Sequence, residues 1–262
     1  MIKVVRRGRF AEWLFQFCFA KTLACRFKYR FEGLPVVGIP KTLKGQEGDY
    51  ILSPLTHIEG QWPFDAYTGR PLLPEELVNP PYSNLTLQGF FQRYDLFAEN
   101  TYEIREDWLR PDQILERCGS DEFLVCLHFG VSFTEDETLI QNSCLREDEV
   151  RRLVKTVAHG KLHILTDSPK HALIKSLVDL GATIAVENEL ESLLFIRSFQ
   201  KIAISQCALH WWGAFLSDAK EIYFPPCNRG IWLHPAPALH VHEPNYHGID
   251  LRVNEPRYIY DW

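Results

Sequence analysis

The sequence predicts an α/β protein with two lobes that both combine strands and helices, and three observations predict this class. A short apolar strand, a glycine turn and an amphipathic helix open the chain within residues 2–18. From residue 121 onward, short apolar runs alternate with segments of helical periodicity, as in a parallel sheet covered by helices. A polar break at residues 118–121 separates the two parts and indicates lobes of similar size.

The first lobe begins with a strand expected at residues 2–5, followed by a turn at Gly8. The helix after this turn carries apolar residues at spacings of three and four, which places them on one face. These residues are Phe10, Trp13, Leu14, Phe17 and Cys18. A strand, a glycine and a helix in this order are typical of the opening of an α/β lobe.

A proline-rich segment follows at residues 35–81, which hold eight of the sixteen prolines. Proline lacks the backbone donor of a sheet or helix, so we expect a long shaped loop here. Its aromatic residues, among them Trp62, Phe64 and Tyr67, favour an ordered loop that forms a wall facing a ligand. Surface packing is the alternative.

The second lobe is predicted from four strand candidates and three helix candidates that alternate along the chain. The strands are expected at 123–127, 162–166, 183–186 and 201–205, and the helices at 146–157, 169–180 and 189–199. Their order predicts a parallel sheet with helices on both faces. We therefore divide the chain into residues 1–120 and 121–262.

Composition argues against several partners and compartments. The net charge of −6 provides no basic field for nucleic acid or an anionic membrane. Seven cysteines without a CxxC pair argue against a disulfide framework and indicate a reducing compartment. Gln16 and Lys21 interrupt the first apolar stretch, and no run reaches the roughly 18 residues of a spanning helix. We expect a cytoplasmic protein, soluble or peripherally associated with a membrane.

Other chemistries lack their motifs. There is no GxGxxG after the first strand, no GxSxG elbow and no P-loop. The histidines of the tail, His240, His242 and His247, fit no metal-binding spacing, and we interpret this segment as a solvated tail. We expect neither a metal nor a bound cofactor.

Polar residues stand where the predicted strands end, and ligands of open parallel sheets bind at that edge. Arginines 6, 7 and 9 flank Gly8 after the first strand; after the later strands come His128, Phe129 and Gly130, then Asp167 and Ser168, then Ser205, Gln206, His210 and Trp211. Together these residues indicate a pocket for a phosphorylated donor, in which the arginines neutralise a diphosphate and Gly130 allows close backbone approach.

Structural alternatives stay open for each of these groups. The arginines could solvate a surface turn, Ser205 and Gln206 could cap the next helix, and one tryptophan of the Trp211-Trp212 pair could only fill the core. His128 is also a candidate catalytic residue, because the reference pKa of histidine is near neutral, although a lone histidine at a strand end is more often structural.

Four motifs resemble those of the α-1,2-fucosyltransferases, in the same order and spacing. Residues 8–20 resemble the family's opening motif GGLGNQLFQYAFA, and Gly89-Phe90-Phe91-Gln92 is similar to its GYFQ element. Ile164-Leu165-Thr166-Asp167 resembles its FSDD strand, and residues 204–214 resemble its SNSSFSWWGA segment. The matches lie between residue 2 and about residue 235.

The resemblance implies a GT-B fold, in which two Rossmann-like lobes face a cleft. It implies transfer of fucose from GDP-fucose to a glycan hydroxyl, with inversion and without a metal. The nucleotide sugar would be a co-substrate held mainly by the later lobe, and the earlier lobe would help bind the glycan acceptor. On this basis we assign acceptor binding to Trp62, Phe64, Tyr67 and Gln92.

One family motif departs strongly. Where the family has HxRRxD, this chain keeps His128 but has lost both arginines and the acid. We therefore expect Arg9 or another basic residue to take over the phosphate charge, and an acid such as Glu12 or Glu135 to deprotonate the acceptor. Two alternatives remain: a degenerate, non-catalytic family member, and a lectin-like glycan-binding protein.

Overall fold

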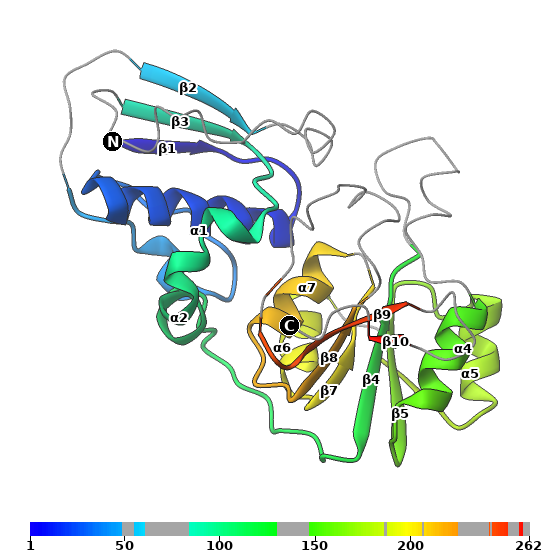
Figure 1. Ribbon diagram of the computed structural model, residues 1–262. Coiled ribbons are helices and arrows are strands. Elements are labelled where there is room, and N and C mark those ends of the chain that lie inside the picture. Colours follow the sequence, from blue (N-terminus) through cyan, green and yellow to red (C-terminus); the bar gives the residue numbers. More distant parts are fainter. Residues whose placement is uncertain are drawn as a thin grey trace. The chain divides into compact units, whose positions relative to one another are not determined.

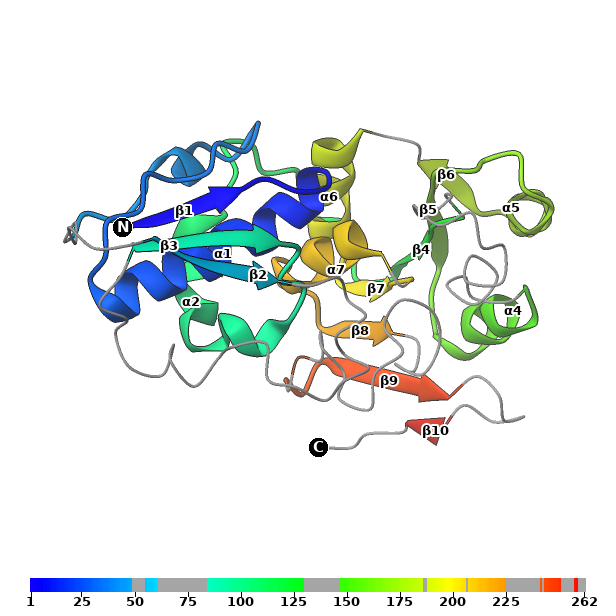
Figure 2. The same ribbon diagram turned by 90° about the horizontal axis from the view of Figure 1, so that it is seen from above.

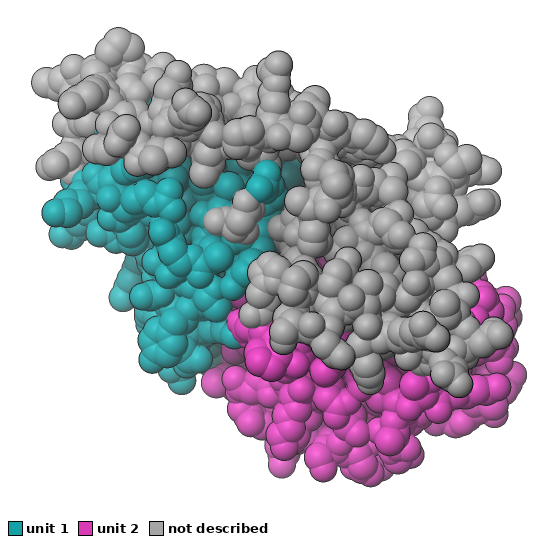
Figure 3. Space-filling model, in the orientation of Figure 1, with its two compact units in different colours: residues 1–112, 234–240 teal, residues 113–233, 241–262 magenta. Residues whose placement is uncertain are grey.

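A computed structural model describes most of the chain (Figure 1). The described residues are 1–48, 55–60, 84–129, 147–185, 188–205, 207–224, 241, 243–250 and 257–258. The chain divides into two compact units, residues 1–112 with 234–240 and residues 113–233 with 241–262 (Figure 3). It is an α/β protein, which agrees with the predicted fold class at that level.

Unit 1 contains a three-stranded parallel sheet and one long helix. The strand order is β1 (Ile2–Val5), β3 (Asn84–Gly89) and β2 (Leu55–Gly60). Helix α1 (Phe10–Phe27) lies along one face of the sheet (Figures 1 and 2). Short helical turns complete the unit at Pro40–Leu43, Tyr94–Leu96, Ala98–Asn100, Thr101–Glu103 (α2) and Ile104–Trp108.

The core of unit 1 is aromatic. Phe15, Phe17 and Phe19 of α1 are fully buried, and every residue from Leu14 to Ala24 is buried, so the helix is enclosed on all sides and not only on the one face that the spacing predicted. Phe19 lies 4.8 Å from the ring of Phe91, and Phe17 meets Trp108 edge to face. The strand, turn and helix expected at the start of the chain are confirmed, and so is the glycine turn, since Gly8 has a φ of +73°.

The prediction of a loop throughout residues 35–81 is wrong for β2. This strand occupies a stretch without proline, between Pro54 and Pro63, and pairs in parallel with β3. Prolines exclude a strand only where they stand, so a six-residue interval rich in Leu, Thr and Ile can still join a sheet. Strand β3 itself was not expected either.

Unit 2 contains a seven-stranded sheet of order β10-β9-β8-β7-β4-β5-β6. All strands but β10 run parallel. Their bounds are β4 Glu122–Leu127, β5 Lys161–Thr166, β6 Thr183–Ala185, β7 Lys201–Ala203, β8 Glu221–Phe224, β9 Tyr246–Asp250 and β10 Arg257–Tyr258. The six-strand parallel sheet confirms the predicted alternation of strands and helices in this half.

Helices cover both faces of this sheet, as Figure 2 shows. The helices are α4 (Glu147–Thr156), α5 (Ala172–Val178), α6 (Glu189–Arg197) and α7 (Ala208–Phe215). Alternate residues of β4, such as Phe123 and Val125, join a core cluster with Val150 of α4 and Ile174 of α5. The intervening residues of a strand point to the opposite face, where α6 and α7 lie.

Part of the tail is not simply solvated, so that interpretation is corrected for residues 246–250. These residues form β9, which pairs with β8, and the ring of His247 lies 5.4 Å from that of Tyr223. No helix in the described ranges is both long and apolar enough to span a membrane.

The contact between α6 and α7 gives a first prediction. A Cβ atom added at Gly213 of α7 would lie 2.7 Å from three atoms of the Ile196 side chain. Gly213→Ala is therefore expected to lower the free energy of unfolding by about 2 kcal/mol, although alanine favours a helix. Chemical denaturation measures this. The double variant with Ile196→Val should recover part of the loss, and an unchanged or higher stability of Gly213→Ala would contradict the tight contact.

Candidate functional site

The candidate site lies at the carboxyl edge of the parallel sheet in unit 2. Leu127 ends β4 and Thr166 ends β5, and these two residues are register partners. His128 and Asp167, the residues that directly follow these two strands, therefore lie next to each other. Nδ1 of His128 is 3.0 Å from Oδ2 of Asp167. The other carboxylate oxygen of Asp167 accepts a hydrogen bond of 2.9 Å from the backbone N–H of Phe129.

These contacts keep Asp167 ionised. Burial raises the pKa of its carboxyl group, but the hydrogen bonds from His128 and from the Phe129 N–H outweigh burial and lower the pKa to about 2. A carboxylate beside Nδ1 favours the tautomer with the proton on that nitrogen, so the proton-accepting lone pair of neutral His128 is at Nε2. The arrangement is that of a histidine oriented as a general base.

A buried pair lies beside this dyad. Ser205 follows β7, and its Oγ is 2.9 Å from Nδ1 of His210 in the first turn of α7. The ring of His210 stands perpendicular to that of His128, with centroids 6.2 Å apart. Burial, followed by the charge of His128, lowers the pKa of His210 to about 3, so His210 is neutral near pH 7.

The loop after β5 adds an aromatic contact. The rings of Phe129 and His171 stack at 4.1 Å, and Nδ1 of His171 accepts a hydrogen bond from Leu173 N at the start of α5. The backbone N–H of Ser168 donates to the Thr166 hydroxyl at 3.1 Å. The sequence analysis missed His171, and only its position shortly after a strand end could have indicated it.

Trp211 contributes to packing. Its ring stacks on that of Phe215 at 4.8 Å, and the residue is 5% exposed. Trp212 is fully buried beside it. Both tryptophans therefore pack in the hydrophobic core, as the structural alternative predicted for at least one of them. A contact of Trp211 with the donor stays a prediction.

The predicted site residues of unit 1 form a structured turn. Glu12 accepts a hydrogen bond of 2.9 Å from the backbone N–H of Arg9 at the start of α1. Gly8 is needed because a Cβ there would lie 2.9 Å from atoms of Glu12 and Phe90. Gln92, the predicted acceptor residue, is half-buried after β3. The described bond of Glu12 stabilises the helix start, which is a structural role.

Two neighbouring arginines make contacts of their own. The Arg6 guanidinium lies 4.7 Å above the Trp13 ring and also donates to the Pro35 carbonyl. The backbone of Arg7 is clamped by the buried side chain of Gln16, which donates to the Arg7 carbonyl at 2.7 Å. Arg6 thus has partners within unit 1, which favours the structural alternative for this residue.

Six predicted site residues lie outside the described residues. They are Trp62, Phe64, Tyr67, Gly130, Glu135 and Gln206. The structure brings together His128, Phe129, Asp167, Ser205 and His210 within unit 2. Across the described ranges, no three His, Cys, Asp or Glu side chains are grouped to hold a metal, and metal-independent chemistry stays a prediction.

No protein-family model, curated protein or solved structure matches this chain.

Proposed function

We propose that the chain is an inverting glycosyltransferase that moves a sugar, fucose from GDP-fucose in the first instance, to a glycan hydroxyl without a metal. The observation that carries the proposal is the His128–Asp167 contact at the carboxyl edge of the unit 2 sheet. Motifs that resemble those of the α-1,2-fucosyltransferases stand at this edge, at residues 164–167 and 204–214. Nucleotides bind at such edges in open α/β sheets.

Of the three catalytic candidates, Glu12, His128 and Glu135, we favour His128 as the general base because of its contact with Asp167. The reaction must remove a proton from the acceptor hydroxyl as it attacks the anomeric carbon, and an oriented histidine performs this step near neutral pH. Asp167 holds the imidazole through Nδ1, which leaves Nε2 to accept the proton of the acceptor hydroxyl. Glu12 is the weaker candidate, because its carboxylate already accepts the Arg9 N–H.

Diphosphate binding has to differ from that implied by the resemblance. Among the described residues, the carboxylate of Asp167 contacts His128 and the Phe129 N–H, and no ion pair joins it to a lysine or arginine. The ionised Asp167 also repels a phosphate placed close to it. We therefore expect the donor to bind with its diphosphate away from Asp167, and with a lower affinity than two arginine contacts would provide.

A thermal-shift panel tests this function. The purified protein is heated with GDP, UDP, CMP and their common sugar conjugates, each at several concentrations. A donor present at 100 times its Kd stabilises the folded state by about 2.7 kcal/mol, and we expect GDP-fucose and GDP to raise the Tm by several degrees. Free fucose and inorganic phosphate are the controls.

The other outcomes separate the alternatives. A shift with another nucleotide alone would change the donor. A shift with GDP-fucose without transfer to any glycan acceptor would indicate a non-catalytic family member. Binding of a free glycan without any nucleotide effect would indicate a lectin, and the absence of a shift with every nucleotide would contradict the proposal.

A further inference from the structure

The imidazole of His128 needs a second contact to keep one orientation. Its side chain is 42% exposed, so solvent surrounds much of it, and Nδ1 lies 3.0 Å from Oδ2 of Asp167. A single hydrogen bond acts as a pivot, because the ring can turn about the line between the two atoms and the bond tolerates a range of angles. The position of Nε2, which takes the acceptor proton in the proposed function, therefore depends on what packs against the ring.

The ring of His210 provides such a contact. It stands perpendicular to the ring of His128, with an interplanar angle of 90° and centroids 6.2 Å apart, which is an edge-to-face arrangement. A ring packed in this way hinders rotation of its neighbour. The contact restrains the exposed His128 only if His210 is itself fixed.

The core of unit 2 fixes His210. His210 is 5% exposed and Ser205 is 3% exposed, and Oγ of Ser205 lies 2.9 Å from Nδ1 of His210. Rotation of either side chain would leave a buried polar atom without a partner, which costs more than the bond itself contributes. The backbone of His210 belongs to α7, and the next two residues, Trp211 and Trp212, are buried. His210 therefore forms a rigid wall beside His128.

His210 is also uncharged where His128 becomes charged. Burial, followed by the charge of His128, lowers the pKa of His210 to about 3, so His210 is neutral near pH 7. Once His128 has taken the acceptor proton it is a cation, and a second cation beside it would oppose that step. A neutral ring can thus orient His128 without hindering its protonation.

We propose that His210, held by Ser205, is a positioning residue that keeps Nδ1 of His128 on Asp167 and leaves Nε2 free for the acceptor proton. The catalytic consequence rests on the proposed function, whereas the orientation of His128 is measurable without donor or acceptor. This role differs from the donor contact that the sequence predicts for His210, because it assigns the ring a contact within the protein.

Nuclear magnetic resonance of the whole chain, with nitrogen-15 in its histidine rings, tests this orientation. Spectra are recorded at about pH 8.5, where an exposed histidine is neutral. We expect the ring of wild-type His128 to carry its proton on Nδ1, and His128→Gln identifies its signals by their absence. In His210→Ala this Nδ1–H signal should weaken about twofold or more, because the ring can then leave Asp167 for other rotamers.

Two further variants separate the ring of His210 from its bond to Ser205. Ser205→Ala removes only a hydroxyl, so it should fold even if His210→Ala does not, and the Nδ1–H signal of His128 should weaken less than in His210→Ala. The double variant with Ser205→Ala and His210→Phe restores a ring and leaves no buried hydroxyl unbonded. It should recover most of the wild-type signal.

Ser217→Ala is the matched control for Ser205→Ala. Ser217 is also buried, and it follows the other end of α7, where its hydroxyl donates to the Ala214 carbonyl at 2.6 Å. Its loss removes a buried hydroxyl of the same kind without touching His210. The Nδ1–H signal of His128 should therefore be that of the wild type.

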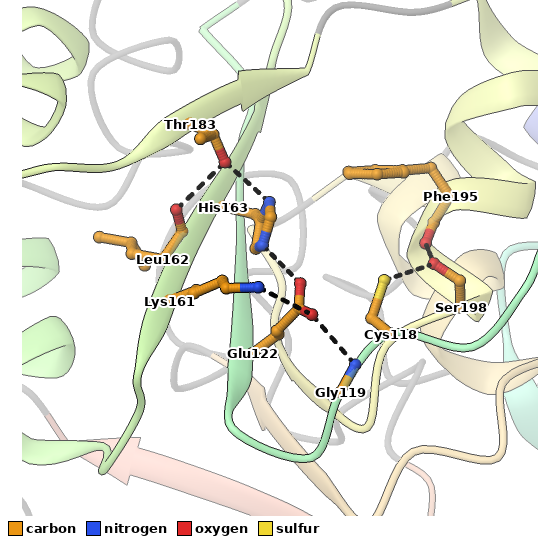
Figure 4. Close-up of polar contacts among 9 residues, drawn as sticks. All are labelled: Cys118, Gly119, Glu122, Lys161, Leu162, His163, Thr183, Phe195 and Ser198. Atoms are coloured by element: carbon orange, nitrogen blue, oxygen red, sulfur yellow. Dashed lines mark hydrogen bonds and ion pairs between the residues drawn. The ribbon is translucent and has the colours of Figure 1, made fainter.

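His163 provides a reference within the same spectra. Its Nε2 lies 2.7 Å from a carboxylate oxygen of Glu122, and its Nδ1 lies 2.8 Å from the Thr183 hydroxyl (Figure 4). These residues lie near the beginnings of β4, β5 and β6, whereas His128 follows the end of β4. The signals of His163 should be the same in all of these proteins.

The catalytic consequence is measured as sugar transfer. With saturating donor and acceptor, His210→Ala should lower kcat about tenfold to 100-fold, because a displacement of a reacting group by about 1 Å suffices for such a loss. The thermal shift produced by GDP-fucose should stay close to that of the wild type. Absence of transfer by the wild type would contradict the proposed function, while the spectra would still decide whether His210 orients His128.

A wild-type His128 whose ring proton is not on Nδ1 would overturn the inference without any variant. An unchanged Nδ1–H signal in folded His210→Ala, or in Ser205→Ala if His210→Ala does not fold, would overturn it too. Equal loss of transfer and of GDP-fucose binding in His210→Ala would assign His210 to the donor instead. A weakened signal that the double variant restores supports the positioning role.

Discussion

Acidification below about pH 6.5 is expected to destabilise the protein by about 1.4 kcal/mol per pH unit through His210. His210 is buried, with a folded-state pKa of about 3 against an ordinary value of 6.5. Below the ordinary value the unfolded chain takes up a proton that the folded protein does not, so the free energy of unfolding falls with pH. The loss levels off once pH passes the folded-state pKa.

Asp167 does not interfere in most of this window. Its pKa is lowered from 3.8 to about 2 in the folded protein, so its contribution to stability is present above pH 3.8 and is lost as pH falls through about 2. Between pH 6.5 and pH 4.5 the effect assigned to His210 is therefore separable from that of Asp167.

Urea denaturation at a series of pH values between 7 and 4.5 measures this dependence. His210→Gln is the matched variant, because a glutamine amide can still bond the Ser205 hydroxyl but does not titrate. The variant should lose about 1.4 kcal/mol per pH unit of slope relative to the wild type. If the free energy of unfolding changed equally with pH in the two proteins, the pKa of His210 would not be lowered in the folded state.

The sequence predicted four strands of the unit 2 sheet, β4, β5, β6 and β7, and the signal was clearest where a strand is a nearly continuous apolar run. Strands buried on both faces, such as β4 and β5, show this pattern, and the amphipathic helices between them were expected at nearly the observed positions. The predicted ends of the helices differed from the observed ends where a capping side chain determines the end. Asn188, for example, caps α6 by accepting a hydrogen bond from Glu191 N.

Strands β2, β3, β8, β9 and β10 were not predicted. For example, β2 (Leu-Thr-His-Ile-Glu-Gly) and β9 (Tyr-His-Gly-Ile-Asp) mix polar and apolar residues. A short run of mixed polarity is too weak a local signal, and pairing with another strand then decides the structure. Local patterns carry no information on that partner.

The candidate site was predicted in its residues but not in its contacts. Both His128 and Asp167 stood out as polar residues after strands, yet their contact depends on the register of β4 and β5. The closeness of Ser205 and His210 depends on where α7 begins. Register and helix start are set by tertiary packing, so the sequence indicated a shared edge and left the partners open.

Replacing His128 is expected to cost far more in catalysis than in donor binding. If His128 takes the acceptor proton, His128→Gln should lower the kcat for sugar transfer by about 10²- to 10⁴-fold, the usual contribution of a general base. The thermal shift produced by GDP-fucose should stay close to that of the wild type. The kcat of Asp167→Asn should lie between that of the wild type and that of His128→Gln. The amide oxygen of asparagine can still accept a hydrogen bond from Nδ1–H, but it lacks the negative charge.

Steady-state assays with saturating donor and acceptor measure kcat for these variants, and Ser176→Ala is the control. Its hydroxyl donates to the Leu173 carbonyl within α5, so its loss should leave the transfer rate unchanged. Equal loss of transfer and donor binding in His128→Gln would assign His128 to donor binding or to structure. Full activity of His128→Gln would exclude it as the base and return that role to an acid such as Glu12 or Glu135, because the chemistry still requires an acceptor for the hydroxyl proton.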